Sequence, residues 1–200
     1  MSIKGILRRI GLYEKEEFLV FQSDFNNIPQ PKVKLEYRAL SFKDLEDLTY
    51  FKIGRNPKYI QRRFNKGCEC FGFFLEGKFA YAMWLSHDCL EDDTGRLPPI
   101  KIQNSVWLFD GFTMPEFRRL GVYASAGSYI QEILKARGET KALTVCAADN
   151  LISKKAIQKA GFYQVFSIDY RRVFFFFIHS RPQNRTLQGA DGAWPLSINF

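Results

Sequence analysis

Two aromatic-rich runs separated by a two-residue turn constrain the fold of this chain more than any other feature. The runs are Cys68 to Leu75 and Lys78 to Ser86, and Glu76-Gly77 joins them. Two residues that end in glycine between strand-forming runs are typical of a β-hairpin, because glycine adopts the positive φ that such turns require. Strands joined by so short a turn pair antiparallel. The sequence therefore predicts an antiparallel arrangement in this part of the chain.

The second half of the chain alternates strand and helix patterns instead. Residues 105–113 are rich in Val, Trp, Leu and Phe, which predicts a strand, and a helical spacing of apolar residues follows. Ala142 to Ala147 predicts another strand, and Asp149 or Asn150 then caps a helix that ends at Gly161. A strand–helix–strand order favours a parallel crossover. Together with the hairpin, it predicts an α+β fold with a mixed sheet.

The chain divides by pattern into three parts. Residues 1–31 form an N-terminal extension, with a basic amphipathic helix over 2–10 and a strand over 18–25. Residues 32–179 form the main domain, and residues 180–200 form a polar tail. We favour packing of the first helix against the domain over a weak contact with an anionic membrane. We find neither a secretion signal nor an apolar run of the ~18–20 residues that span a membrane, so we expect a cytoplasmic protein. We expect it to be a monomer or a homodimer.

Net charge and cysteine spacing limit the classes of partner. The formal net charge of +8 favours an anionic partner, which includes nucleic acid, anionic lipid and a phosphorylated cofactor. No single element carries a basic stripe interleaved with aromatic residues, which argues against nucleic acid. The four cysteines, Cys68, Cys70, Cys89 and Cys146, lack the spacing of zinc ligands. We therefore expect reduced thiols and no metal site.

The segment from Met114 to Ala124 has the chemistry of a phosphate cradle. It leaves a predicted strand and enters a predicted helix, and Gly121 lets the backbone turn tightly between them. N–H groups and the dipole at a helix N-terminus attract an anion, and Arg118 and Arg119 add positive charge beside it. The alternative is an ordinary strand–helix turn with solvated arginines. The segment lacks both the P-loop pattern and the G-x-G-x-x-G fingerprint.

The cradle resembles one motif of the GNAT superfamily of acyl-CoA-dependent N-acyltransferases. That family has a Q/R-x-x-G-x-G/A turn, to which Arg118, Gly121 and Tyr123 correspond, with tyrosine in place of the small residue. Further along, the family has an N-x-x-S/A helix start and a closing Gly-Phe. Asn150 and Ser153 match the helix start, and Gly161 and Phe162 match the close. The order of elements is also similar over about residues 34–178.

The resemblance implies a fold and a cofactor. The fold is the acyl-CoA N-acyltransferase fold, a mostly antiparallel sheet of six to seven strands with helices on both faces. The acyl donor is acetyl-CoA. The strand that ends at Thr113 should diverge from the next strand and hold the pantetheine arm in the gap, with backbone groups of Phe112 and Thr113 bonded to its amides. Asn150 and Ser153 would lie beside that arm and the thioester. The pyrophosphate would be held by Arg118, Arg119, Leu120, Gly121, Val122 and Tyr123.

The catalytic groups depart from the family pattern. Many members have a tyrosine as general acid at the position of Ile157. A thiol with a pKa of about 8.5 leaves without a proton donor more easily than most groups, so transfer is still feasible. An alkyl ammonium with a pKa of about 10 must lose a proton before it attacks. Asp110, inside an apolar strand near the expected thioester, is the candidate catalytic base. Its alternative role is structural, bonded to backbone or to an arginine.

These features predict an N-acetyltransferase that acts on a primary amine of a small polar acceptor, such as an amino sugar, by direct attack in a ternary complex. The segments Arg55 to Phe64 and Asp88 to Pro99 should shape the acceptor pocket. One alternative is a non-catalytic acyl-CoA-binding module, which Ile157 suggests. A basic nucleic-acid-binding domain is the weaker alternative.

Overall fold

The computed structural model describes residues 13–48, 50, 56–90, 100–173 and 176–179. The strands in this part of the chain are β1 Tyr13–Ser23, β2 Glu36–Leu40, β3 Glu69–Leu75, β4 Lys78–Leu90, β5 Ile100–Thr113, β6 Ala142–Ala147, β7 Tyr163–Val173 and β8 Phe176–His179. The helices are α2 Phe42–Asp47, α3 Pro57–Asn65, α4 Val122–Ala136 and α5 Leu151–Lys159, and a 3₁₀ turn, η2, covers Pro115–Phe117.

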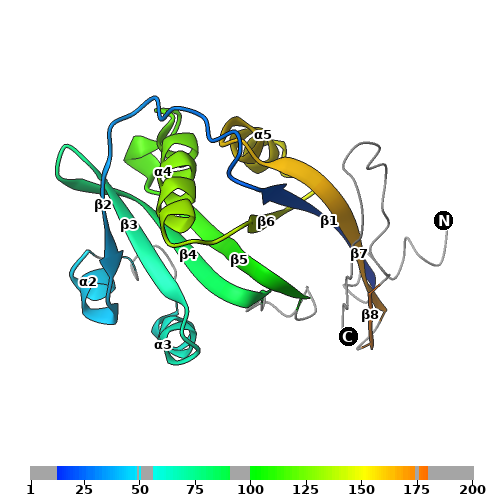
Figure 1. The fold of residues 1–200 in the computed structure, drawn as a ribbon. Helices are drawn as coiled ribbons and strands as arrows, with labels where there is room; N and C mark the ends of the chain where they lie inside the picture. The colour runs from blue at the N-terminus through cyan, green and yellow to red at the C-terminus, as the bar shows by residue number, and fades with distance from the viewer. Residues whose placement is uncertain (1–12, 49, 51–55, 91–99, 174–175, 180–200) are drawn as a thin grey trace.

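All eight strands form a single sheet, with the order β2-β3-β4-β5-β6-β1-β7-β8 (Figure 1). Every neighbouring pair is antiparallel except β5 and β6, which are parallel. The predicted fold class, a mixed and mostly antiparallel sheet, is therefore confirmed. The sheet has one strand more than the six to seven that we expected, because β7 and β8 form a hairpin in which Val173 pairs with Phe176.

The hairpin between β3 and β4 is the one that the sequence predicts. Leu75 pairs with Lys78 across the turn. Both turn residues have positive φ, 51° at Glu76 and 74° at Gly77, as a type I′ turn requires. This turn sets the register between β3 and β4.

The strand that we predicted within the N-terminal extension lies inside the sheet. β1 pairs antiparallel with β6 on one side and with β7 on the other. Val20 and Phe21 are accordingly fully buried on opposite faces. A boundary at residue 31 therefore does not separate β1 from the main sheet. The helix predicted over residues 2–10 and the tail over 180–200 lie outside the described residues.

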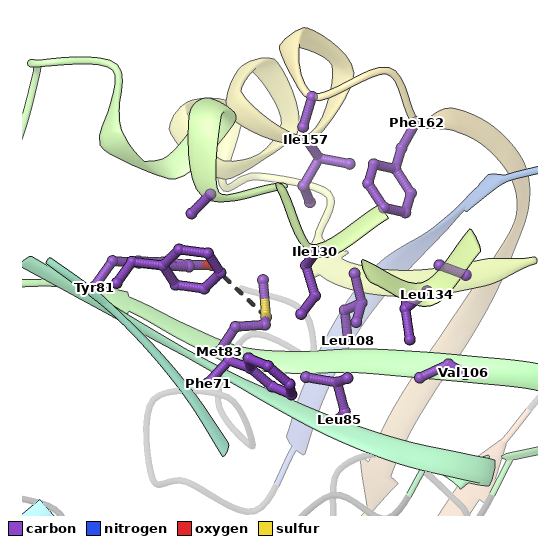
Figure 2. Packing of buried hydrophobic residues seen from close by; sticks show 14 of the residues in the cluster. Phe71, Tyr81, Met83, Leu85, Val106, Leu108, Ile130, Leu134, Ile157 and Phe162 are labelled. Atoms are coloured by element: carbon purple, nitrogen blue, oxygen red, sulfur yellow. Dashed lines mark hydrogen bonds between the residues drawn. The ribbon is translucent and has the colours of Figure 1, made fainter. Parts of the chain in front are cut away.

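Helices cover both faces of the sheet, as predicted. In Figure 1, α4 and α5 lie above the sheet, and α2 and α3 lie below it. Side chains of β4 alternate between the two layers. Tyr81, Met83 and Leu85 belong to the cluster under α4 and α5, which Figure 2 shows, whereas Ala82 and Trp84 belong to the cluster under α2 and α3. The strands between these layers carry the candidate site.

Candidate functional site

The parallel strands β5 and β6 diverge. They pair only over residues 106–108 and 142–144, although β5 continues to Thr113 and β6 continues to Ala147. Past this point β5 stays paired with β4, and β6 stays paired with β1. A gap therefore opens at the carboxyl ends of the two strands. This confirms the divergence that we predicted for the strand ending at Thr113.

A β-bulge lies in β5 beside the gap. Asp110 and Gly111 together lie opposite Met83 of β4, and Asp110 has a φ of 48°. A bulge bends its strand and redirects the side chains. Gly111 is needed here because a Cβ at this position would overlap the Tyr81 hydroxyl. The bulge therefore combines a close backbone approach with a change in the direction of the Asp110 side chain.

The turn into α4 has the geometry expected of an anion cradle. Gly121 is the N-cap of α4, with a φ of 83° in the left-handed region, and Arg119 before it has a φ of 66°. The first bond of the helix runs from Ser125 N–H to the Gly121 carbonyl, at 3.1 Å. The N–H groups of residues 122–124 precede that bond, and no side chain of the described residues caps them. Gly121 is exposed, so this helix end is open to an anion.

Arg118 is held at the end of β5. Its Nε donates to the Thr113 carbonyl at 3.3 Å, and its guanidinium lies 5.6 Å from the Phe112 ring centre. Arg119 and Leu120 are exposed. Phe112 and Thr113, whose backbone groups we expect to bond pantetheine, thus lie next to Arg118 at the start of the predicted pyrophosphate turn. Contact of either group with a cofactor stays a prediction.

Arg118→Ala should weaken acetyl-CoA binding by about tenfold or less, because the N–H groups and the helix dipole remain. The loss should be larger at low salt, since exposed charge attraction is screened by ions. Calorimetry at two salt concentrations measures both effects. Lys58→Ala, which removes an exposed charge on α3, is the matched control. A salt-independent loss of more than about 100-fold would contradict a cradle built mainly from backbone.

Tyr123 points inward, beneath the start of α4. Its ring packs edge to face on Tyr81, with ring centres 5.5 Å apart. Burial raises the pKa of the Tyr123 phenol well above its usual value. The side chain thus leaves the exposed end of the helix clear, although a small residue is usual at this position of the GNAT motif.

The closed end of the gap is nearly filled by side chains. Leu108 and Thr144, the last paired residues of β5 and β6, line a cavity there with Tyr123 and Ile157. Its volume is about 10 Å³, room for about one water molecule. Ile157 points from α5 toward the sheet and is 2% exposed (Figure 2). Tyr123 is the tyrosine in this lining, and sequence reasoning did not place it there.

The start of α5 lies directly after β6, on the other side of the gap. Asn150 is its N-cap, and its Oδ1 accepts a hydrogen bond from Ser153 N–H at 3.0 Å. The two motif residues therefore form a cap, as the N-x-x-S spacing requires. In β6, burial raises the pKa of the Cys146 thiol, and the Lys154 charge partly opposes that shift. The motif helices α4 and α5 thus begin at the ends of the two diverging strands.

Asp110 forms an ion pair with Arg63 of α3. Arg63 Nη1 lies 2.7 Å from Asp110 Oδ2, and the two side chains are only 11% and 16% exposed. The Arg63 guanidinium also lies 5.0 Å from the Trp84 ring centre and 5.1 Å from that of Phe109. The structural alternative for Asp110, an acid paired with an arginine, is therefore what the structure shows. Its role as a base stays a prediction.

A pocket lies on the α3 face, beside this ion pair. Its volume is about 280 Å³. It is lined by Arg62, Arg63, Lys66, Cys68, Ser86, His87, Cys89 and Phe109. The first two residues fall in the segment 55–64 that we expected at the acceptor pocket. Most of the second expected segment, residues 91–99, lies outside the described part of the chain.

Among the described residues, no three His, Cys, Asp or Glu side chains gather as they would around a metal ion. All four cysteines are free thiols. No helix in the described ranges is long and apolar enough to cross a membrane.

Solved structures share this fold. A GNAT-family acetyltransferase from Colwellia psychrerythraea matches with a TM-score of 0.55 at 15% identity, over 81% of this chain and 57% of that chain. A GCN5-related N-acetyltransferase from Sphaerobacter thermophilus matches with a TM-score of 0.57 at 11% identity, over 84% and 55%. A protein of unknown function from Staphylococcus epidermidis has a TM-score of 0.57 at 9% identity, over 87% and 69%.

These similarities establish the fold alone, because all three identities are below 25%. No protein-family model and no curated protein matches the sequence. The chain spans 55% and 57% of the length of the two acetyltransferase chains. The protein has the fold of the GNAT superfamily, the acyl-CoA N-acyltransferase fold, as the two sequence motifs implied.

Proposed function

We propose that the protein is an N-acetyltransferase that uses acetyl-CoA as acyl donor and a primary amine of a small molecule as acceptor. The observation that carries this proposal is the gap between β5 and β6, which opens beside the uncapped N-terminus of α4. One acetyl-CoA molecule would then place its pyrophosphate at Gly121 and extend its pantetheine arm into the gap. The fold shared with GNAT acetyltransferases supports the same conclusion.

The residues would divide the task as follows. The N–H groups of residues 122–124 and the α4 dipole hold the pyrophosphate, and Arg118 and Arg119 add charge. Backbone groups of Phe112 and Thr113 bond the pantetheine amides, and Asn150 and Ser153 lie beside the arm. The neutral amine attacks the thioester carbonyl, N–H groups of the sheet stabilise the oxyanion, and the CoA thiolate leaves. Asp110 is the candidate acceptor of the amine proton.

Acetyl-CoA should raise the melting temperature of the protein. A ligand at 100 times its Kd stabilises the native state by about 2.7 kcal/mol. For a chain of this length, that corresponds to roughly 5–10 °C. Thermal unfolding with and without acetyl-CoA measures the shift, and adenosine with acetate is the control that lacks the pyrophosphate and the pantetheine. An unchanged melting curve at millimolar acetyl-CoA would remove the proposal.

One observation favours a second candidate, a non-catalytic acyl-CoA-binding module. Ile157 is buried where many GNAT members have their acid, and the cavity beside it is small. A thioester that entered there would require neighbouring side chains to move. Steady release of free CoA in the presence of an amine distinguishes the two candidates, because a binding module releases none.

A further inference from the structure

The closed end of the gap between β5 and β6 has a lining of unusual chemistry. The gap closes at Leu108 and Thr144, where the two strands are paired. An extended ligand arm that enters at the open end can go no further than this point. The eight residues that line the small cavity there are mostly apolar, and only Tyr123 and Thr144 have a side chain that can donate a hydrogen bond. The end of the arm therefore meets an apolar wall that contains one phenol and one alkyl hydroxyl.

The helices that form this wall are fixed to each other. Gln131 of α4 is fully buried, and its Nε2 donates to the Gly127 carbonyl at 2.8 Å and to the Ala160 carbonyl at 2.7 Å. A Cβ at Gly127 would lie only 2.8 Å from the Ala160 Cβ, so α4 and α5 are as close as a glycine permits. Gly127 and Ala160 both line the cavity. A donor on such a wall is preorganised, because the wall does not have to rearrange during a reaction.

The Tyr123 ring is held in place, whereas its hydroxyl is available to a ligand. The ring packs edge to face on Tyr81. Tyr81 is itself fully buried, and its hydroxyl donates to Met83 Sδ at 3.6 Å (Figure 2). Within the described ranges, the Tyr123 hydroxyl has no hydrogen-bond partner. It can therefore donate to a group that arrives at the closed end of the gap.

The phenol of Tyr123 stays protonated at neutral pH. Burial raises its pKa well above the usual value. Its titratable neighbours are Tyr81 and Cys146, and burial raises the pKa of both, so they are neutral as well. A thiol has a pKa of about 8.5, so a phenol with a raised pKa does not give up its proton to a thiolate. Tyr123 is suited to donate a hydrogen bond to an anion, not to transfer a proton to it.

We propose that Tyr123 is a catalytic residue whose hydroxyl donates a hydrogen bond to the sulfur of the acyl donor and stabilises the CoA thiolate as it leaves. The inference rests on the proposed acetyltransferase function and concerns its leaving-group step. The amine nitrogen bonds to the carbonyl carbon, and the carbon–sulfur bond breaks with its electron pair on sulfur. The amine proton goes to the base, for which Asp110 is the candidate. CoA leaves as the thiolate and takes a proton from water, and Tyr123 keeps its own proton throughout.

The direct test titrates the thiol of CoA bound to the protein. The ultraviolet absorbance of the thiolate follows the titration, with the protein alone as the baseline. A hydrogen bond to the thiolate favours the charged form and lowers the pKa of the thiol. Tyr123→Phe keeps the ring on Tyr81 and removes only the hydroxyl, so the pKa of the bound thiol should rise by about 1–2 units. An unchanged thiol pKa in this variant, with CoA bound, would overturn the inference.

Two further hydroxyl deletions are the matched controls. Tyr129→Phe removes a phenol hydroxyl from the same helix, where the ring packs on Tyr37 outside the cavity lining. Thr144→Val removes the other hydroxyl of the lining itself. Neither should change the pKa of the bound thiol. A rise in Thr144→Val in place of Tyr123→Phe would identify Thr144 as the donor and overturn the assignment, and an equal rise in all three would mean a general effect of altered packing and overturn it too.

Turnover provides an independent readout and separates this inference from the proposed function. Tyr123→Phe should lower kcat by about 10–100-fold and change KM for acetyl-CoA by less than about twofold, because the bond strengthens as charge develops on sulfur. A shifted thiol pKa without acetyl transfer to any amine would support the contact with sulfur and contradict the proposed function. Acetyl transfer with an unchanged kcat in Tyr123→Phe would contradict the catalytic role of Tyr123 alone. Failure of CoA to bind would overturn both.

Discussion

Gly121→Val is expected to abolish acetyl-CoA binding while the protein stays folded. Gly121 has a φ of 83°, which costs a residue with a Cβ about 1–2 kcal/mol. The new side chain would also stand at the exposed N-terminus of α4, where the pyrophosphate is expected. The fold itself has room for it, because the nearest described atom to a Cβ at this position is a Val33 methyl at 3.7 Å. We expect an affinity loss of about 100-fold or more, measured by calorimetry.

Gly138→Val is the matched control for this variant. Gly138 follows the other end of α4 with the same φ of 83°, and no described atom lies within 4 Å of a Cβ there. Backbone strain should therefore destabilise both variants to a similar degree, but only Gly121→Val should lose the ligand. Dephospho-CoA, which lacks the ribose phosphate and keeps the pyrophosphate, should suffer the same loss as CoA. If Gly121→Val binds acetyl-CoA as tightly as the wild type, the turn is not the cofactor site.

Asp110→Asn should lower turnover by about 10²–10⁴-fold, the range expected for loss of a general base. It should not weaken acetyl-CoA binding. It should also lower the free energy of unfolding by about 2–4 kcal/mol, because the Arg63 guanidinium loses its partner in a mostly buried ion pair. Steady-state kinetics, calorimetry and urea denaturation measure the three quantities. The assay temperature must keep the variant folded.

Arg63→Met separates the two roles of Asp110. It breaks the same ion pair but keeps the carboxylate, so a base at Asp110 would retain far more of kcat than in Asp110→Asn. The same small primary amine, such as butylamine, serves as acceptor for both variants. Equal kcat losses in the two variants would assign Asp110 to structure, as would an unchanged rate in folded Asp110→Asn at neutral pH.

Features set within a few residues could be predicted from the sequence. The Glu76-Gly77 turn needs two positive φ values, which a hairpin of this length imposes on its own. The Asn150 cap needs only the N–H group of Ser153 three residues on. The positive φ of Gly121 likewise follows from the tight strand-to-helix turn that the local pattern predicts. Local sterics and local hydrogen bonds determine each of these, so the motifs and their geometry agree.

Other features depend on which segments meet in space, so they can be seen only in the folded protein. β1 carries an ordinary strand pattern, but its place between β6 and β7 depends on the energy of the whole sheet. Arg63 and Asp110 lie 47 residues apart, and no local signal joins them. Tyr123 occupies the position of a small family residue, and only packing against Tyr81 shows that its ring points inward. Turns, caps and the order of elements follow from short stretches of sequence, whereas strand partners and side-chain partners depend on long-range packing that no short window of residues contains.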